Sequence, residues 1–277
     1  MIRLGLRVHP EDAEAVLAQL LELSPNGVEE TDAGELVEFA VYGAPGELPE
    51  LPALRAAAGA ALCEVVTERL PDDWFDGWKR FHTPVVIGER LRIRPPWAPP
   101  AASPGQLDIV IDPGQAFGTG SHDTTRACLE LMLDLPPAGS FADVGCGSGV
   151  LAIAAAVLGW APVMALDVEP EAVRAAGANS RANGADVEVR RLDLRRDPPP
   201  AADTIAANLL RPLLLDLAGG LDSPPRHLIA GGLLRKEADD VVDAFARRGL
   251  RERHRRETGE WATILFERGR PRLRPAV

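Results

Sequence analysis

Cysteine, lysine and uninterrupted hydrophobic segments are scarce in this chain of 277 residues. Three cysteines (Cys63, Cys128 and Cys146) are too few and too scattered for a disulfide framework or a zinc site, so we expect a reducing, cytoplasmic setting and no metal. The uncharged stretch 150–166 is shorter than the roughly 20 residues that a membrane-spanning helix needs. Residues 1–12 hold no apolar segment of a secretory signal. These absences predict a protein without membrane association.

Positive charge is scarce in the N-terminal quarter of the chain. Residues 1–70 carry four Arg and thirteen Asp or Glu, a net charge of −9 out of −11 for the whole chain. Proteins that bind nucleic acids concentrate Lys and Arg on one surface, so we expect no direct nucleic-acid binding. An acidic segment suits a basic protein partner, and solubility alone is the alternative interpretation.

The order of sequence patterns predicts two domains joined by a linker. Residues 1–70 are expected to fold as β-α-β-β-α-β, the order of a ferredoxin-like α+β domain. The strands are expected at 2–8, 27–30, 35–41 and 61–68, and the helices from Pro10 and near 51–60. The Trp-rich residues 71–82 are expected to form a linker helix, and a hairpin is expected within 83–97.

Residues 83–277 are predicted to form an α/β domain of Rossmann-like type. From residue 141 onward strands and helices alternate, which indicates a mostly parallel sheet with helices on both faces. The strands are expected at 141–144, 163–167, 187–191, 203–207 and 226–230, and the helices near 149–158, 170–182, 212–219 and 235–248. A terminal antiparallel hairpin is expected at 250–256 and 261–267, and a helix at 126–134 is expected to be capped by Thr124 and Thr125.

A glycine-rich turn after the strand 141–144 is the strongest functional signal. Its sequence is Asp143-Val-Gly145-Cys-Gly147-Ser-Gly149. Glycines at such a turn let the backbone approach a ligand and open a helix whose first N–H groups face it. Asp167 ends the next strand, where a carboxylate can hold ribose hydroxyls. The two features together indicate a nucleotide-like cofactor.

Two classes of cofactor fit this turn. The pattern Gly147-x-Gly149-x-x-Ala152 is typical of dinucleotide-binding folds. The carboxylate of Asp143, two residues before the first glycine, is instead similar to the first motif of class I methyltransferases, where it suits the cationic amino-acid end of S-adenosylmethionine. The terminal hairpin also favours the methyltransferase. Asp193, in the loop after strand 187–191, is a candidate ligand for adenine.

The polar residues after the fourth strand and before the helix 126–134 are further candidates. Asn208 begins Asn-Leu-Leu-Arg, which differs from the Asn-Pro-Pro-aromatic sequence of enzymes that methylate DNA adenine or glutamine side chains. His122 is a candidate general base or a capping residue. No G-x-S-x-G elbow passes through Ser121 or Ser148, which argues against a serine hydrolase.

Two segments resemble the bacterial PrmA family, whose members methylate ribosomal protein L11 of the large subunit. They are Asp-Pro-Gly-Gln-Ala-Phe-Gly-Thr-Gly-Ser-His-Asp-Thr-Thr at 112–125 and Asp-Val-Gly-Cys-Gly-Ser-Gly-Val-Leu-Ala-Ile-Ala-Ala at 143–155. The likeness continues in Asp73-Trp74, Trp78-Lys79, Pro96-Trp97, Asn208-Leu209-Leu210 and Gly231-Gly232-Leu233-Leu234. The resemblance implies that residues 1–70 recognise the substrate and that residues 83–277 form a methyltransferase domain.

The same resemblance implies a cofactor, a substrate and a set of site residues. The cofactor is S-adenosylmethionine, and the substrate groups are lysine or N-terminal amines of L11, a basic protein. The expected cofactor residues are Phe117, Gly118, Thr119, Asp143, Gly145, Asp167 and Asn208, to which we add Gly147 and Asp193. Asn208 is also expected to act in catalysis by orienting the amine. Another protein, an RNA or a small molecule is the alternative substrate.

Overall fold

The computed structural model describes residues 2–13, 16–17, 20, 28–43, 58–69, 83–100, 105–113 and 122–269. Contacts divide the chain into two compact units, Met1–Phe81 and His82–Val277, and each is described by itself. The linker helix expected at 71–82 lies outside the described residues, as does most of the helix expected near 51–60.

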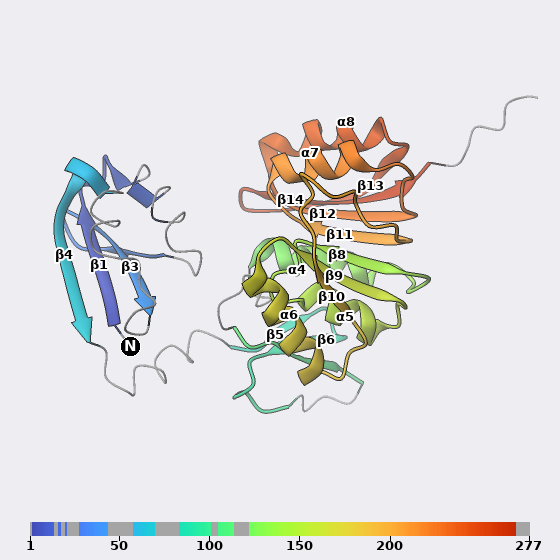
Figure 1. The fold of residues 1–277 in the computed structure, drawn as a ribbon, viewed down its shortest axis with the longest axis horizontal. Helices are drawn as coiled ribbons and strands as arrows, with labels where there is room; N and C mark the ends of the chain where they lie inside the picture. The colour runs from blue at the N-terminus through green and yellow to red at the C-terminus, as the bar shows by residue number, and fades with distance from the viewer. Residues whose placement is uncertain are drawn as a thin grey trace, which may run out of the picture. The chain divides into compact units, whose positions relative to one another are not determined.

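The first unit is built on an antiparallel sheet in which the described strands follow the order β2-β3-β1-β4 (Figure 1). The strands are β1 (Ile2–Val8), β2 (Glu29–Asp32), β3 (Val37–Gly43) and β4 (Leu62–Arg69), the last preceded by the 3₁₀ turn η1 (Gly59–Ala61). Alternate side chains of β1, among them Leu4 and Leu6, are buried against Phe39 of β3. On the opposite face Arg7 pairs with Glu38.

These strands lie close to their predicted positions, with both β2 and β3 two residues later than expected. The register explains this shift, because Glu29 pairs with Ala40 and Asp32 with Val37, which leaves residues 33–36 for the turn. Residues 13, 16, 17 and 20 are helical, in agreement with the first expected helix. Because most residues of both helices lie outside the described part of the unit, the ferredoxin-like assignment stays a prediction.

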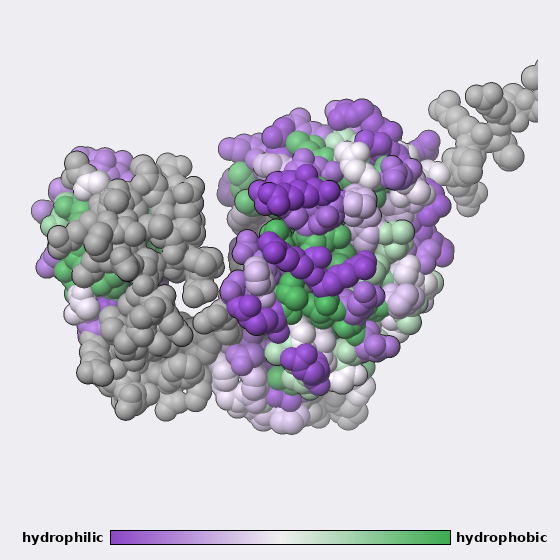
Figure 2. All heavy atoms as spheres, viewed as in Figure 1, coloured by the Kyte–Doolittle hydropathy of each residue, from purple (hydrophilic) through white to green (hydrophobic). Residues whose placement is uncertain are grey.

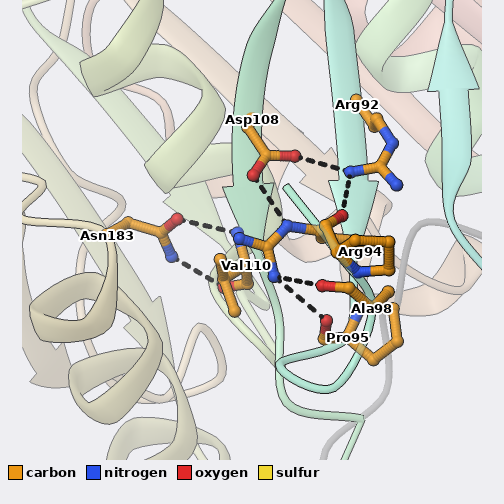
Figure 3. Close-up of polar contacts among 8 residues, drawn as sticks. Arg92, Arg94, Pro95, Ala98, Asp108, Val110 and Asn183 are labelled. Carbon is orange, nitrogen blue, oxygen red and sulfur yellow. Dashed lines mark hydrogen bonds and ion pairs between the residues drawn. The ribbon is translucent and has the colours of Figure 1, made fainter. Parts of the chain in front are cut away.

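The second unit begins with a small sheet of β5 (Val85–Ile87), β6 (Leu91–Arg94) and β7 (Leu107–Val110). The hairpin of β5 and β6 matches the prediction, whereas β7, which runs parallel to β6, was not expected. Arg92 and Arg94 of β6 both donate to Asp108 of β7, at 3.0 and 2.7 Å (Figure 3). Arg92 and Arg94 lie two residues apart and so on the same face of β6, and the carboxylate that they share comes from β7, 14 to 16 residues further along the chain.

Strands from residue 141 onward form one sheet in the order β10-β9-β8-β11-β12-β14-β13. They are β8 (Phe141–Val144), β9 (Val163–Asp167), β10 (Glu188–Arg191), β11 (Thr204–Asn208), β12 (His227–Leu234), β13 (Leu250–Thr258) and β14 (Trp261–Arg268). All neighbours are parallel except those that involve β14, which confirms the predicted parallel sheet and terminal hairpin.

Helices cover this sheet and complete its core (Figure 1). They are α4 (Asp123–Leu133), α5 (Val150–Leu158), α6 (Pro170–Ala182), α7 (Arg211–Gly220) and α8 (Ala238–Ala246), the last preceded by the 3₁₀ turn η2 (Arg235–Glu237). The sheet separates two clusters of buried side chains, one with α4 and α5 and the other with α7 and α8. In Figure 2 hydrophobic residues gather in the middle of the visible face and hydrophilic residues lie over α7 and α8.

Three helix and strand boundaries near the carboxyl ends of the parallel strands differ from the prediction. Helix α4 begins at Asp123 rather than at residue 126, and its N-cap is His122 rather than Thr124 or Thr125. Strand β11 lies one residue later than expected, so that Asn208 is its last member instead of following it. Strand β12 continues to Leu234, because the bulge between Ala230 and Leu233 lets it resume pairing with β14.

Candidate cofactor and catalytic site

The glycine-rich turn joins β8 to α5 in a conformation that its glycines make possible. Gly145, Gly147 and Gly149 all have positive φ angles, of 76, 51 and 81°. A side chain at Gly149 would also place its Cβ 3.0 Å from that of Ala176 on α6. The turn at the carboxyl end of β8 is therefore fixed both by backbone conformation and by close packing, and Gly145 and Gly147 are half-buried in it.

Asp143 of β8 is fully buried behind this turn. Its Oδ2 accepts a hydrogen bond from the backbone N–H of Ala152 at 3.1 Å, while its Oδ1 has no partner among the described residues. Burial is the main cause that raises the pKa of Asp143 to about 7; the Ala152 N–H lowers the pKa and the nearby carboxylate of Asp167 adds to the rise. A buried acceptor without a donor is costly, so this oxygen marks a place for a hydrogen-bonding or cationic ligand group.

Asp167 lies at the end of β9, beside the same turn. Its Oδ2 accepts from the backbone N–H of Gly147 at 2.9 Å and its Oδ1 from that of Glu169 at 3.0 Å. A carboxylate has about four acceptor sites, so both oxygens keep capacity for further hydrogen bonds. The structure thus brings Asp143, Gly147 and Asp167 together, as expected from parallel strands whose carboxyl ends meet at one edge.

Asn208, the last residue of β11, is held by helix α4. Its Nδ2 donates to the hydroxyl oxygens of Thr124 and Thr125, at 3.1 and 3.3 Å. Its Oδ1 is buried and has no partner in the described part of the chain. Asn208 and Asp143 therefore present two unpartnered oxygens from adjacent strands, β11 and β8, where the strand order reverses.

His122 acts in the structure as the cap of α4. Its Nδ1 accepts from the backbone N–H of Thr124 at 3.3 Å and lies 2.9 Å from the Thr124 hydroxyl. The ring meets that of Trp261 edge-on, with centroids 5.5 Å apart. These contacts give the histidine a structural role at the end of the helix that positions Asn208.

Comparison with known proteins identifies the family in which this sequence is found. The sequence model of the ribosomal protein L11 methyltransferases (PrmA) matches residues 52–269.

The chain belongs to this family.

Relatives of the PrmA family span most of the chain. The ribosomal protein L11 methyltransferase of Pelotomaculum thermopropionicum is 33% identical over 299 residues, 95% of this chain and 97% of the relative. That of Geobacter metallireducens is 40% identical over 207 residues, 74% of this chain and 69% of the relative. The crystal structure of a ribosomal protein L11 methylase from Lactobacillus delbrueckii subsp. bulgaricus superposes with a TM-score of 0.61 at 31% identity, covering 68% of this chain and all of that one.

Of the remaining expected site residues of this PrmA-family chain, the structure describes Asp193. Asp193, beyond β10, accepts from the side chain and backbone of Arg195 at 3.0 and 3.1 Å, and these bonds lower its pKa. It lies in a local turn, and the described hydrogen bonds of its side chain go to Arg195 and not to the glycine turn. Phe117, Gly118 and Thr119 lie outside the described residues.

The described residues also bear on metals and membranes. They hold no group of three or more metal-ligating side chains. None of the described helices is long and apolar enough to cross a membrane.

Sequence reasoning missed Asn179, a buried amide on α6 that bonds to the glycine turn. Its signal was an Asn among Ala172, Ala176 and Ser180 on the buried helix face.

Proposed function

We propose that this protein transfers methyl groups from S-adenosylmethionine to lysine or N-terminal amino groups of ribosomal protein L11. The observation that carries the proposal is the match to the ribosomal protein L11 methyltransferase family over residues 52–269. The cofactor assignment rests on the family and on the residues at the sheet edge. The free cysteines suit a reducing compartment, and we propose the cytoplasm.

Residues at the carboxyl ends of β8, β9 and β11 fit this cofactor. The unpartnered Oδ1 of Asp143 suits a cationic ammonium group, and Gly147 has no side chain to keep a ligand from its backbone. Asp167 would hold ribose hydroxyls through its remaining acceptor capacity. Phe117, Gly118, Thr119 and Asp193 stay in the proposed set on the sequence alone. When bound, S-adenosylmethionine supplies a methyl carbon on a cationic sulfur.

The substrate amine must be neutral to attack that carbon. Deprotonating a lysine with a reference pKa of about 10.4 costs about 4.6 kcal/mol at pH 7. A neighbouring positive charge and a desolvated site both lower this cost. We propose that the buried Oδ1 of Asn208 accepts a hydrogen bond from the neutral amine and orients its lone pair, because the Nδ2 of Asn208 is fixed by Thr124 and Thr125.

Replacement of Asn208 tests this role. We expect Asn208→Ala to lower kcat on L11 by at least tenfold, since the acceptor for the amine is removed. The matched control is Asn183→Ala, which removes another half-buried amide of the same unit, bonded at Val110 instead. Wild-type kcat in Asn208→Ala would refute the proposed role.

The acidic first unit is proposed to dock the basic substrate protein. All four side chains of its edge strand β2, Glu29–Asp32, are exposed, and three of them are carboxylates. Removal of residues 1–70 should abolish activity on L11 and leave cofactor binding in place. Equal activity of the truncated and full-length proteins would refute this docking role.

Mass spectrometry of L11 incubated with the protein and S-adenosylmethionine tests the proposed function directly. Mass gains in steps of one methyl group, mapped to lysine or the N-terminal amine, are the expected result. The absence of any gain, with a preparation that binds S-adenosylhomocysteine, would refute L11 as the substrate and favour another protein, an RNA or a small molecule.

A further inference from the structure

Helix α6 carries two side-chain amides where it faces the rest of the unit. Asn179 is 3% exposed, and Asn183, the residue that caps the helix, is half-buried. The neighbouring positions on this face hold Ala172 and Ala176. A buried amide among apolar residues is costly unless it is hydrogen-bonded, so the partners of these two side chains identify what they hold.

The two amides bond to the backbone of β7 and of the residues just after it, on the edge that does not pair with β6. On its other edge β7 pairs with β6: the backbone N–H groups of Leu107 and of Ile111, just after β7, donate to the backbone carbonyl oxygens of Arg90 and Arg94. Between them, Val110 exchanges two hydrogen bonds with Asn183, N–H to Oδ1 at 2.8 Å and Nδ2 to the carbonyl at 2.7 Å (Figure 3).

Asn179 continues this pairing two residues along the chain. Its Oδ1 accepts from the backbone N–H of Asp112 at 3.1 Å. Positions i and i+4 of a helix are about 6.0 Å apart along its axis, and positions i and i+2 of a strand about 6.6 Å. The amides of one helical turn therefore match the spacing of one strand edge, and α6 serves β7 and the residues after it as a neighbouring strand would.

Asn179 differs from Asn183 in having a second partner in the glycine turn. Its Nδ2 donates to the carbonyl oxygen of Ser148 at 2.9 Å. One helical turn earlier, Ala176 lies so close to Gly149 that a Cβ on residue 149 would be 3.1 Å from the Cα of Ala176. The second donor bond of Asn183, at 2.8 Å, goes to the carbonyl of Asn179 within the helix end.

We propose that Asn179 is a positioning residue of the cofactor site. Its single amide holds the glycine turn at Ser148 and the backbone at Asp112 in one register, so that the turn is presented to the cofactor in a fixed conformation. The identity of the ligand rests on the proposed function. Asn183 stabilises β7 through a similar amide and has no bond to the turn, which makes it the matched control.

The test compares Asn179→Leu with Asn183→Leu by calorimetric titration with S-adenosylhomocysteine and by thermal denaturation. Both variants should lose stability, because each removes hydrogen bonds of a buried amide. Only Asn179→Leu should weaken cofactor binding, by at least tenfold, with kcat at saturating cofactor within about threefold of wild type. Asn179→Asp, which keeps the acceptor for Asp112 and loses the donor to Ser148, should weaken binding as well.

Equal affinity of Asn179→Leu and wild type, or equal weakening by Asn183→Leu, would overturn the proposal. A wild-type protein that binds neither S-adenosylmethionine nor S-adenosylhomocysteine would instead refute the proposed function. If the Asn179 variants do not fold, amide hydrogen exchange on the wild-type protein decides. Cofactor binding should then slow exchange at Asp112 more than at Val110, and equal slowing or none would overturn the proposal.

Discussion

Lowering the pH from 7 to 5.5 should weaken cofactor binding, because the pKa of Asp143 lies near 7 in the free protein. The proposed partner of its unpartnered oxygen is an ammonium group, which binds the carboxylate and not the neutral acid. An α-amino group has a reference pKa of about 7.7–8.0 and so stays protonated over this range. The ligand therefore keeps its proton on binding, and Asp143 releases about half a proton per site at pH 7 and nearly one at pH 5.5.

The size of the effect follows from the ionised fraction of Asp143. With a pKa of about 7 the carboxylate is about half ionised at pH 7 and about one-eleventh ionised at pH 6, and the apparent Kd rises by the inverse of that fraction. The apparent Kd should thus increase about fivefold between pH 7 and pH 6 and about tenfold per unit below that. Titrations with S-adenosylhomocysteine in buffers of different ionisation enthalpy measure both the Kd and the released proton.

Asp143→Asn should change affinity and stability in opposite directions. A folded pKa of about 7, raised from 3.8, means that the free protein loses stability as the pH rises from about 4 to 7, by about 4 kcal/mol in total. An uncharged amide avoids this loss of stability, but its unsatisfied polar group destabilises the protein by about 1–3 kcal/mol. We expect the variant to be more stable than wild type by about 1–3 kcal/mol at pH 7.5 and to bind the cofactor more weakly.

The pH slope of cofactor binding should disappear in Asp143→Asn. The matched control is Asp203→Asn, which removes an exposed carboxylate at the opposite end of the sheet, where hydrogen bonds from Ser140 lower its pKa. This control should keep the wild-type slope. A wild-type Kd that is constant between pH 5.5 and 7, or an Asp143→Asn variant that binds as tightly as wild type, would refute the reasoning.

Two further predictions concern backbone strain and a buried imidazole. Gly232→Ala should lower the free energy of unfolding by about 2 kcal/mol or more. An alanine at φ 75° has the penalty of the left-handed conformation, and its Cβ would also clash with the Leu209 carbonyl oxygen 2.7 Å away. It should also lower kcat by moving Asn208. Gly259→Ala, with φ 56° and no atom within 4 Å, should cost only the conformational part and keep kcat, and equal effects in urea denaturation would contradict this. Burial lowers the pKa of His227 below 6.5, so its imidazole opposes folding as the pH falls below 6.5. The stability of wild type relative to His227→Gln should therefore decline from pH 6.5 to 5 in thermal denaturation, and a pH-independent difference would exclude this role.

Local sequence was sufficient for the alternating elements of the second unit and for the glycine turn. Alternation of apolar strands with amphipathic helices predicted β8 to β12 and their helices to within a few residues, because each pattern reports the repeat of its own backbone. The glycines at 145, 147 and 149 likewise predicted a turn that opens a helix, and the structure has this turn, with positive φ angles at all three glycines. Asp143, Asp167 and Asn208 could be placed at one sheet edge because parallel strands align their carboxyl ends.

Only the tertiary structure decided the partners of buried polar groups. The parallel pairing of β7 with β6 and the bonds of Asn179 to Ser148 and Asp112 join residues far apart in the chain, and no local pattern encodes such contacts. The raised pKa of Asp143 has the same origin, since the packing around β8 removes water from a carboxylate that would otherwise titrate near 3.8. The sequence thus determines which residues can carry the chemistry, and burial by distant segments determines which of their atoms lack a partner and await a ligand.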